Sequence, residues 1–235
     1  MEQGPNAALL TSLGKVVRGL SALFWSLPAA LMMAALTVKG EWFKVAGMVP
    51  LTIAMGLMLY GIQLLFAFQP QERIWRHALE RARLIAIVNV GLAPFLFFWS
   101  KISASEFFSV TVQVLIITSL VFLYLLNSVL ARLGAMLPDE TLRGETRLFT
   151  RLNQLILIAI IIALPTYFLL RRFTTLPRFV AEPLAFLERG SQLFHFAGVL
   201  VFVLLPVAMT MALLWKTKEV ILTGVFTSNE TAQRT

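Results

Sequence analysis

The sequence predicts an all-α polytopic membrane protein, with six transmembrane helices paired in three hairpins and amphipathic segments on the cytoplasmic side. The first observation behind this prediction is composition: 58% of the residues are hydrophobic and 14% are charged, with a mean hydropathy of +0.81. Soluble domains have about 45–50% apolar and about 25% charged residues. Secondly, the apolar residues form long runs. Thirdly, amphipathic stretches carrying charged residues precede three of these runs.

Six apolar runs are candidates for membrane-spanning helices, since a helix needs about 20 apolar residues to cross the hydrocarbon core. The third and fifth runs are short, so either the bilayer thins around them or each continues from the amphipathic segment before it. Together the six runs form one domain, residues 1–222, and the polar tail at 223–235 is expected to be disordered. In chain order the runs are 20–38, 47–67, 84–99, 108–130, 154–170 and 195–215.

The amphipathic segments precede the first, third and fifth runs, with apolar residues at helical spacing in each. The central one carries the apolar stripe Ile74, Trp75 and Leu79 beside the basic residues Arg73 and Arg76. Two interpretations of this surface stay open. In the first, the segment is a membrane-surface helix with a solvated polar face. In the second, its apolar stripe docks to a soluble partner.

A proline precedes each amphipathic segment, and another lies 23, 24 or 27 residues further on, inside the apolar run that follows. This pattern predicts weak repeats over 5–69, 70–137 and 138–222, each a helical hairpin that begins on the same side of the membrane. The alternative is that any six-helix protein with a cytoplasmic N-terminus shows a similar alternation.

Four prolines lie near the middle of apolar runs, where each deprives the carbonyl four residues earlier of its usual hydrogen bond. Such prolines act as kinks that suit helix packing, or they mark hinged helices at a transport site. The four residues are Pro28, Pro94, Pro165 and Pro206.

A layer of neutral polar residues is predicted about 6–10 Å from the cytoplasmic ends of the helices, from the rise of 1.5 Å per residue. Its members are Gln63, Asn89, Asn127 and Thr210. One interpretation is hydrogen bonding between helices. The other is a polar ring that lines a cavity for a neutral substrate or a lipid headgroup.

The basic residues set the expected orientation. Of the 20 Lys and Arg residues, 13 fall before the first run, in the second and fourth loops or after the sixth run, and 7 fall on the other side. The positive-inside rule then places both termini in the cytoplasm, with a bacterial inner membrane as the expected location. It also accounts for the net charge of +8 without nucleic acid as a partner. Anionic lipid headgroups are the expected partners at this face.

The ionisable and nucleophilic residues of the chain favour a non-catalytic protein, but they do not exclude an enzyme. The apolar runs contain no Asp, Glu, Lys or Arg, and their one histidine, His195, lies at the end of the sixth run. The chain has no cysteine, and no catalytic, nucleotide-binding or metal-binding motif is present. No cofactor or metal site is therefore predicted. The sequence favours a non-catalytic structural or accessory subunit of a larger membrane complex, with protein partners or further copies of the chain. The alternative is a self-contained transporter or channel for a small neutral or amphiphilic substrate.

Overall fold

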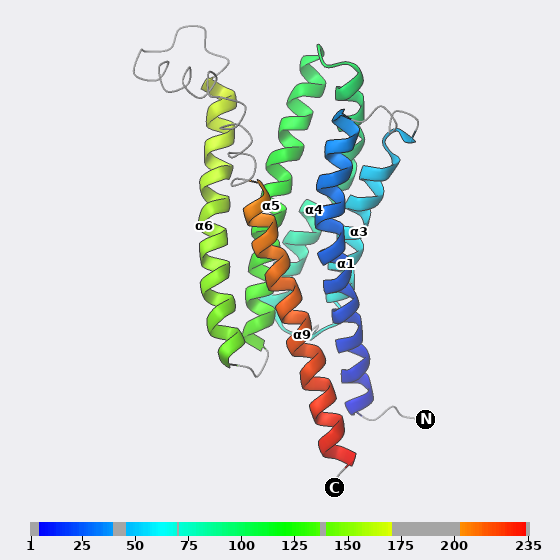
Figure 1. Ribbon diagram of the computed structural model, residues 1–235, viewed down its shortest axis with the longest axis vertical. Coiled ribbons are helices and arrows are strands. Elements are labelled where there is room, and N and C mark those ends of the chain that lie inside the picture. Colours follow the sequence, from blue (N-terminus) through cyan, green and yellow to red (C-terminus); the bar gives the residue numbers. More distant parts are fainter. Residues whose placement is uncertain (1–4, 40–45, 70, 137–139, 171–202, 234–235) are drawn as a thin grey trace.

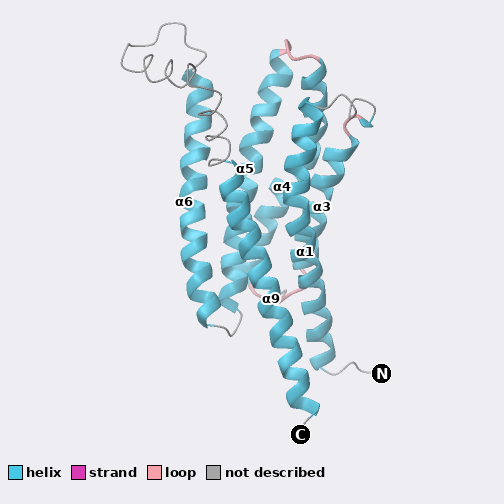
Figure 2. Ribbon diagram, viewed as in Figure 1, coloured by secondary structure: helices cyan, strands magenta, loops and turns pink. Residues whose placement is uncertain are grey.

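The computed structural model describes residues 5–39, 46–69, 71–136, 140–170 and 203–233. Within these ranges the chain forms six α-helices and no strand, which confirms the predicted all-α class (Figures 1 and 2). The helices are α1 (Pro5–Lys39), α3 (Val49–Leu65), α4 (Arg73–Lys101), α5 (Glu106–Met136), α6 (Glu140–Leu170) and α9 (Leu205–Gln233).

The helices alternate in direction and form a closed ring (Figure 1). Each helix packs against the next one in the chain from α1 through α6 to α9, and α9 also packs against α1. The first turn of α1 and the last turn of α9 lie at the same end of the bundle. The contacts do not single out the three predicted hairpins, because α3 with α4 and α5 with α6 pack together as do α1 with α3, α4 with α5, and α6 with α9.

Four helical stretches are long and apolar enough to cross a membrane: Thr11–Lys39, Arg73–Lys101, Glu106–Met136 and Thr146–Leu170. Helix α3 is apolar but has 17 residues, the lower limit for crossing. Helix α9 is not among the four; it begins at Leu205, and residues 195–202 of the predicted sixth run lie outside the described part of the chain. The apolar helices indicate an integral membrane protein.

The amphipathic segments are not separate helices lying on the membrane surface. For the third and fifth runs the structure confirms the other prediction, that the run continues from the amphipathic segment before it. All three segments are the first turns of long continuous helices: α1 has 35 residues, α4 has 29 and α6 has 31. At 1.5 Å per residue α1 is about 52 Å long, whereas the hydrocarbon core is about 30 Å thick. No proline lies between the first residue of each helix and the apolar run that follows, so nothing forces the helix to end there.

The polar tail is a second correction. The sequence predicted disorder from residue 223, but α9 continues as a helix to Gln233. The polar residues after position 223 include no proline, so composition alone gave no reason for the helix to stop.

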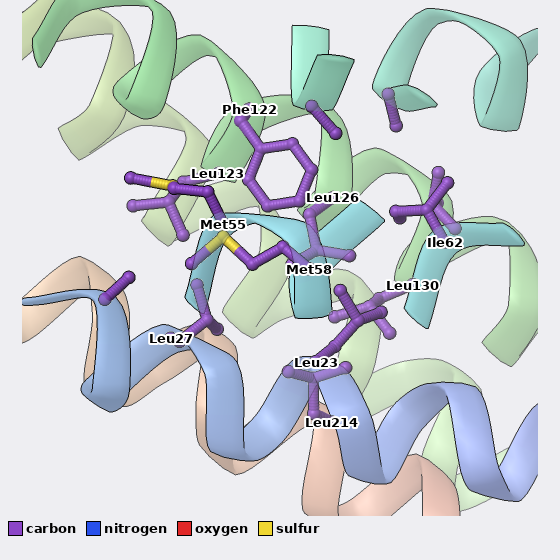
Figure 3. Packing of buried hydrophobic residues seen from close by; sticks show 14 of the residues in the cluster. Leu23, Leu27, Met55, Met58, Ile62, Phe122, Leu123, Leu126, Leu130 and Leu214 are labelled. Atoms are coloured by element: carbon purple, nitrogen blue, oxygen red, sulfur yellow. The ribbon is translucent and has the colours of Figure 1, made fainter. Parts of the chain in front are cut away.

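Buried leucine, methionine and phenylalanine side chains fill the centre of the ring (Figure 3). Leu23 and Leu27 of α1 lie close to Met55 and Met58 of α3, and Leu126 of α5 approaches from the opposite side. In contrast, the outer faces carry exposed large apolar residues, such as Trp25, Ile53, Ile116 and Ile162. Apolar residues inside and outside are what a helix bundle needs when lipid replaces water as the solvent.

Helices α1 and α3 touch through two glycines. A Cβ atom added to Gly19 would lie 2.8 Å from the carbonyl oxygen of Gly61, and one added to Gly61 would lie 2.7 Å from Cγ of Leu23. Small residues allow this close approach of two backbones, which is a common way to pack helices in membranes.

Replacing Gly19 with alanine is therefore expected to destabilise the protein by about 1–3 kcal/mol, because a backbone carbonyl cannot move aside as a flexible side chain can. Gly91→Ala is the matched control, since nothing lies within 4 Å of its added Cβ. It should be neutral or stabilise the fold by up to about 1 kcal/mol. Thermal unfolding of both variants in lipid nanodiscs measures the difference. Equal melting temperatures for the two variants would contradict the close contact.

Candidate functional site

Three helices, α5, α6 and α9, meet at a buried polar junction formed by Asn127, Asn153 and Thr210. All three side chains are completely buried. Each projects from the helix face that carries apolar core residues, with Leu126 and Leu130 beside Asn127, Leu157 one turn after Asn153, and Leu213 and Leu214 after Thr210. The apolar residues thus hold the three polar groups together and away from solvent.

The junction is connected by short hydrogen bonds. The side-chain amide of Asn153 donates to Oδ1 of Asn127 (3.1 Å), to Oγ1 of Thr210 (3.0 Å) and to the carbonyl oxygen of Pro206 (3.1 Å). The amide of Asn127 donates to Oγ1 of Thr210 (2.8 Å) and to the carbonyl of Leu123 (2.8 Å). Finally, the Thr210 hydroxyl donates to the Pro206 carbonyl (2.8 Å). Every one of the three helices is bonded to the other two.

A second bond between α5 and α6 lies one residue further along each helix. Nε2 of Gln154 donates to Oγ of Ser128 at 2.7 Å, and the Ser128 hydroxyl donates to the carbonyl of Tyr124 at 3.2 Å. Side-chain bonds between membrane helices are worth about 0.6 kcal/mol each on average. The contribution of the whole junction is larger, because removing one partner leaves a buried polar group unsatisfied.

Only two of the four residues in the predicted polar layer meet here. Asn127 and Thr210 are bonded to each other. Gln63 is exposed on α3, and Asn89 is buried in α4 with an Oδ1 atom that accepts no hydrogen bond from the part of the chain that the structure describes. The sequence missed Asn153, which lies one residue before the apolar run that begins at 154. Asn153 could have been found by a search of that helix for polar residues that lie at heptad spacing from its apolar core residues.

Of the two interpretations of the apolar stripe on α4, a membrane-surface face and a docking face, neither holds for two of its three residues. Trp75 and Leu79 are buried inside the protein's own core, at 1% and 0% exposure. Nε1 of Trp75 donates to the carbonyl of Phe68 at 2.9 Å, and the two rings pack edge to face. The stripe has helical periodicity because it packs on neighbouring helices, and Ile74 alone of its residues is exposed.

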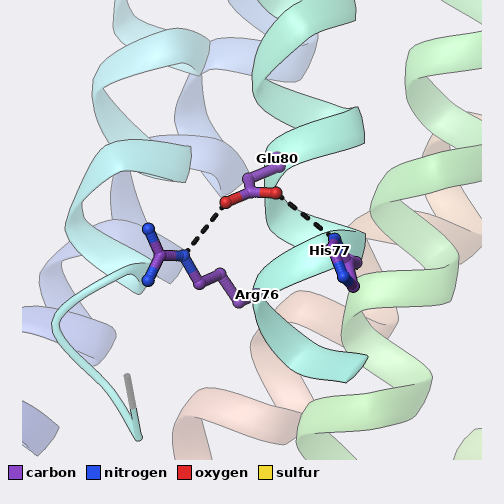
Figure 4. Close-up of polar contacts among 3 residues, drawn as sticks. All are labelled: Arg76, His77 and Glu80. Carbon is purple, nitrogen blue, oxygen red and sulfur yellow. Dashed lines mark hydrogen bonds and ion pairs between the residues drawn. The ribbon is translucent and has the colours of Figure 1, made fainter. Parts of the chain in front are cut away.

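The polar face of α4 is solvent-facing. Arg73 is exposed. Nε of Arg76 lies 3.0 Å from a carboxylate oxygen of Glu80, and Nδ1 of His77 lies 3.4 Å from the other (Figure 4). All three side chains are more than 40% exposed, so these pairs contribute little to stability.

Three of the four prolines lie inside long helices: Pro28 in α1, Pro94 in α4 and Pro165 in α6. The fourth, Pro206, is the second residue of α9 and follows a π-helical turn at residues 203–204. The carbonyl four residues before it belongs to Phe202, which lies outside the described residues. The carbonyl oxygen of Pro206 itself accepts hydrogen bonds from Asn153 and Thr210.

Among the residues that the structure describes, no group of three His, Asp or Glu side chains could hold a metal ion. Comparison of the chain with protein-family models, with curated proteins and with solved structures gave no match.

Proposed function

We propose that the chain is a non-catalytic integral membrane protein that serves as a structural or accessory subunit of a larger membrane assembly. The observation that carries this proposal is the bonding within the junction. Asn127, Asn153 and Thr210 hydrogen-bond to one another and tie three helices together. Polar groups used in this way hold a scaffold rigid, whereas a carrier keeps such groups available for its substrate.

The proposal includes six membrane crossings in three hairpins. Four apolar helices are long enough, and α3 with 17 residues is near the limit. The ring order supports α9 as the sixth crossing, because it packs between α6 and α1 and runs opposite to both (Figure 1). The distribution of Lys and Arg supports cytoplasmic termini in a bacterial inner membrane, with anionic lipid against the basic face.

The test is extraction of the full chain from its native membrane in lipid-bearing polymer discs, followed by mass measurement and quantitative mass spectrometry. The expected result is an assembly heavier than one chain, with partner chains in a fixed ratio to it. A six-helix membrane protein of similar abundance, tagged and extracted in the same way, is the control for chance association. A monomer, or an assembly of this chain alone, would overturn the proposal.

A transporter or channel for a small neutral or amphiphilic substrate is the second candidate. It is favoured by buried polar oxygens that lack partners in the described ranges, among them Oδ1 of Asn89. The double variant with Gln63→Leu and Asn89→Leu separates the two functions. An accessory subunit should remain folded and assembled. A carrier should lose flux in reconstituted vesicles while its expression and melting temperature stay the same.

A further inference from the structure

Helix α6 carries a line of buried oxygen atoms on the face that packs against α5 and α9. They are Oγ1 of Thr146, Oγ1 of Thr150 and Oδ1 of Asn153, on residues that are 2%, 3% and 0% exposed. None of the three atoms has a hydrogen-bond partner within the described ranges. A buried polar group without a hydrogen bond lowers the stability of the fold by about 1–3 kcal/mol. Three such groups on one helix face therefore need an explanation.

Threonine in a helix has a ready way to satisfy its hydroxyl, which is to donate to the carbonyl four residues earlier. Two other buried threonines do this: Thr210 donates to Pro206 at 2.8 Å and Thr217 donates to Leu213 at 2.7 Å. Thr146 and Thr150 do not. Their hydroxyls are therefore available to a partner outside their own helix.

The donor hydrogens of Asn127, Asn153 and Thr210 already take part in hydrogen bonds. The junction therefore has no donor left for Oδ1 of Asn153. The amide of Asn153 donates to two carbonyl-type oxygens, which fixes its nitrogen toward them and leaves Oδ1 on the other side. Both amide hydrogens of Asn127 and the hydroxyl hydrogen of Thr210 are donated as well. A donor for Oδ1 of Asn153 must come from elsewhere.

The three oxygens share one helix face, since their spacing of four and then three residues follows the helical repeat. At 1.5 Å per residue they span about 10 Å of α6. At one end Thr146 lies against α5: a Cβ on Gly134 would be 3.3 Å from Cγ2 of Thr146 and 3.6 Å from its Oγ1. At the other end Asn153 joins the junction with α9.

We propose that this face of α6 binds a short file of water molecules. Water fits the three groups because it donates to the amide oxygen of Asn153 and can both donate to and accept from the two hydroxyls. Buried waters in proteins commonly make about three hydrogen bonds to such otherwise unpaired groups. The file gives the α5–α6–α9 interface a hydrated path from the first turns of α6 to the centre of the junction.

Thr150→Val tests the proposal through the sign of its effect on thermal unfolding of the full chain in nanodiscs. Valine keeps the shape of threonine and removes the hydroxyl. If water bridges Thr150 and Asn153, the melting temperature falls by roughly 2–6 °C, because the water loses a partner and Oδ1 of Asn153 loses its donor. If the site is dry, the same change removes an unsatisfied group and the melting temperature rises.

Thr217→Val is the matched control, since Thr217 is equally buried and its hydroxyl is already bonded within its own helix. Thr217→Val should shift the melting temperature by less than half of the shift that Thr150→Val causes. If Thr150→Val fails to fold, two other variants test the proposal: Thr146→Val and the conservative Thr150→Ser. The proposal requires that Thr146→Val lowers the melting temperature and that Thr150→Ser, which keeps the hydroxyl, is more stable than Thr150→Val.

Exchange of sodium or potassium for choline at constant ionic strength separates water from a cation on the same oxygens. A water file predicts equal melting temperatures of the wild-type chain in the three salts. Stabilisation by either metal ion that is lost in Thr150→Val would overturn the proposal in favour of a cation site. An unchanged or raised melting temperature of Thr150→Val would overturn it in favour of a dry interface.

Discussion

Replacing Trp75 with alanine is expected to destabilise the protein by about 3–5 kcal/mol, the usual range for truncating a buried Trp or Phe. The side chain is 1% exposed. Its loss removes the ring contact with Phe68 and the bond from Nε1 to the Phe68 carbonyl at 2.9 Å. Phe68 lies in the turn between α3 and α4, so Trp75 fixes the angle at which α4 enters the bundle. The measurement is thermal or denaturant unfolding in nanodiscs.

Two further variants identify the source of the loss. Ile74→Ala is the neighbouring control: Ile74 is 55% exposed, and the change should have a small effect. Trp75→Phe keeps one aromatic ring but deletes the N–H and the second ring of the indole, so it should cost more than the roughly 1 kcal/mol of one hydrogen bond and less than Trp75→Ala. If instead Trp75→Ala leaves stability unchanged and releases a bound protein, the stripe is a docking surface and its burial in the core is wrong.

Asn153→Leu is expected to have the second largest effect, a loss of about 2–4 kcal/mol. The change removes the bonds from α6 to Asn127, Thr210 and the Pro206 carbonyl. It leaves Oδ1 of Asn127 without its donor in a buried site, and each such orphaned group costs about 1–3 kcal/mol.

Gln63→Leu is the matched control for this variant, because it makes the same chemical change at an exposed position. It should leave the unfolding temperature nearly unchanged. A double-mutant cycle of Asn127→Leu with Asn153→Leu should give a coupling energy near or above the roughly 0.6 kcal/mol typical of bonds between membrane helices. Strict additivity of the two changes would show that the residues do not interact.

The sequence was sufficient to predict the helices, because long apolar runs leave few alternatives to a membrane helix. It could not tell which surface each apolar stripe would cover. The residues Ile74, Trp75 and Leu79 have the same periodicity whether they pack on lipid, on a partner or on α3. Only the three-dimensional arrangement shows that Trp75 and Leu79 are core residues.

The candidate site was predicted in part for a similar reason. Asn127 and Thr210 are conspicuous within apolar runs, and depth along the helix placed them in one layer. Depth gives no information about rotation around the helix axis, so Gln63 was included although it faces outward. Asn153 was missed because it lies one residue before an apolar run and two residues after Arg151. The Gly19–Gly61 contact was missed because glycine alone does not identify its partner.

The closure of the ring by α9 has a consequence for how the protein is made. The contact between Phe24 and Trp215 joins the first helix to the last, and α9 also supplies Thr210 to the junction. During synthesis the early helices enter the membrane while the ribosome is still translating the C-terminal segment. Asn127 and Asn153 can hydrogen-bond to each other as soon as α5 and α6 are in place, but both lack their Thr210 partner until α9 has been made. One side of α1 likewise lacks its neighbour, so the ring closes only after α9 has been synthesised.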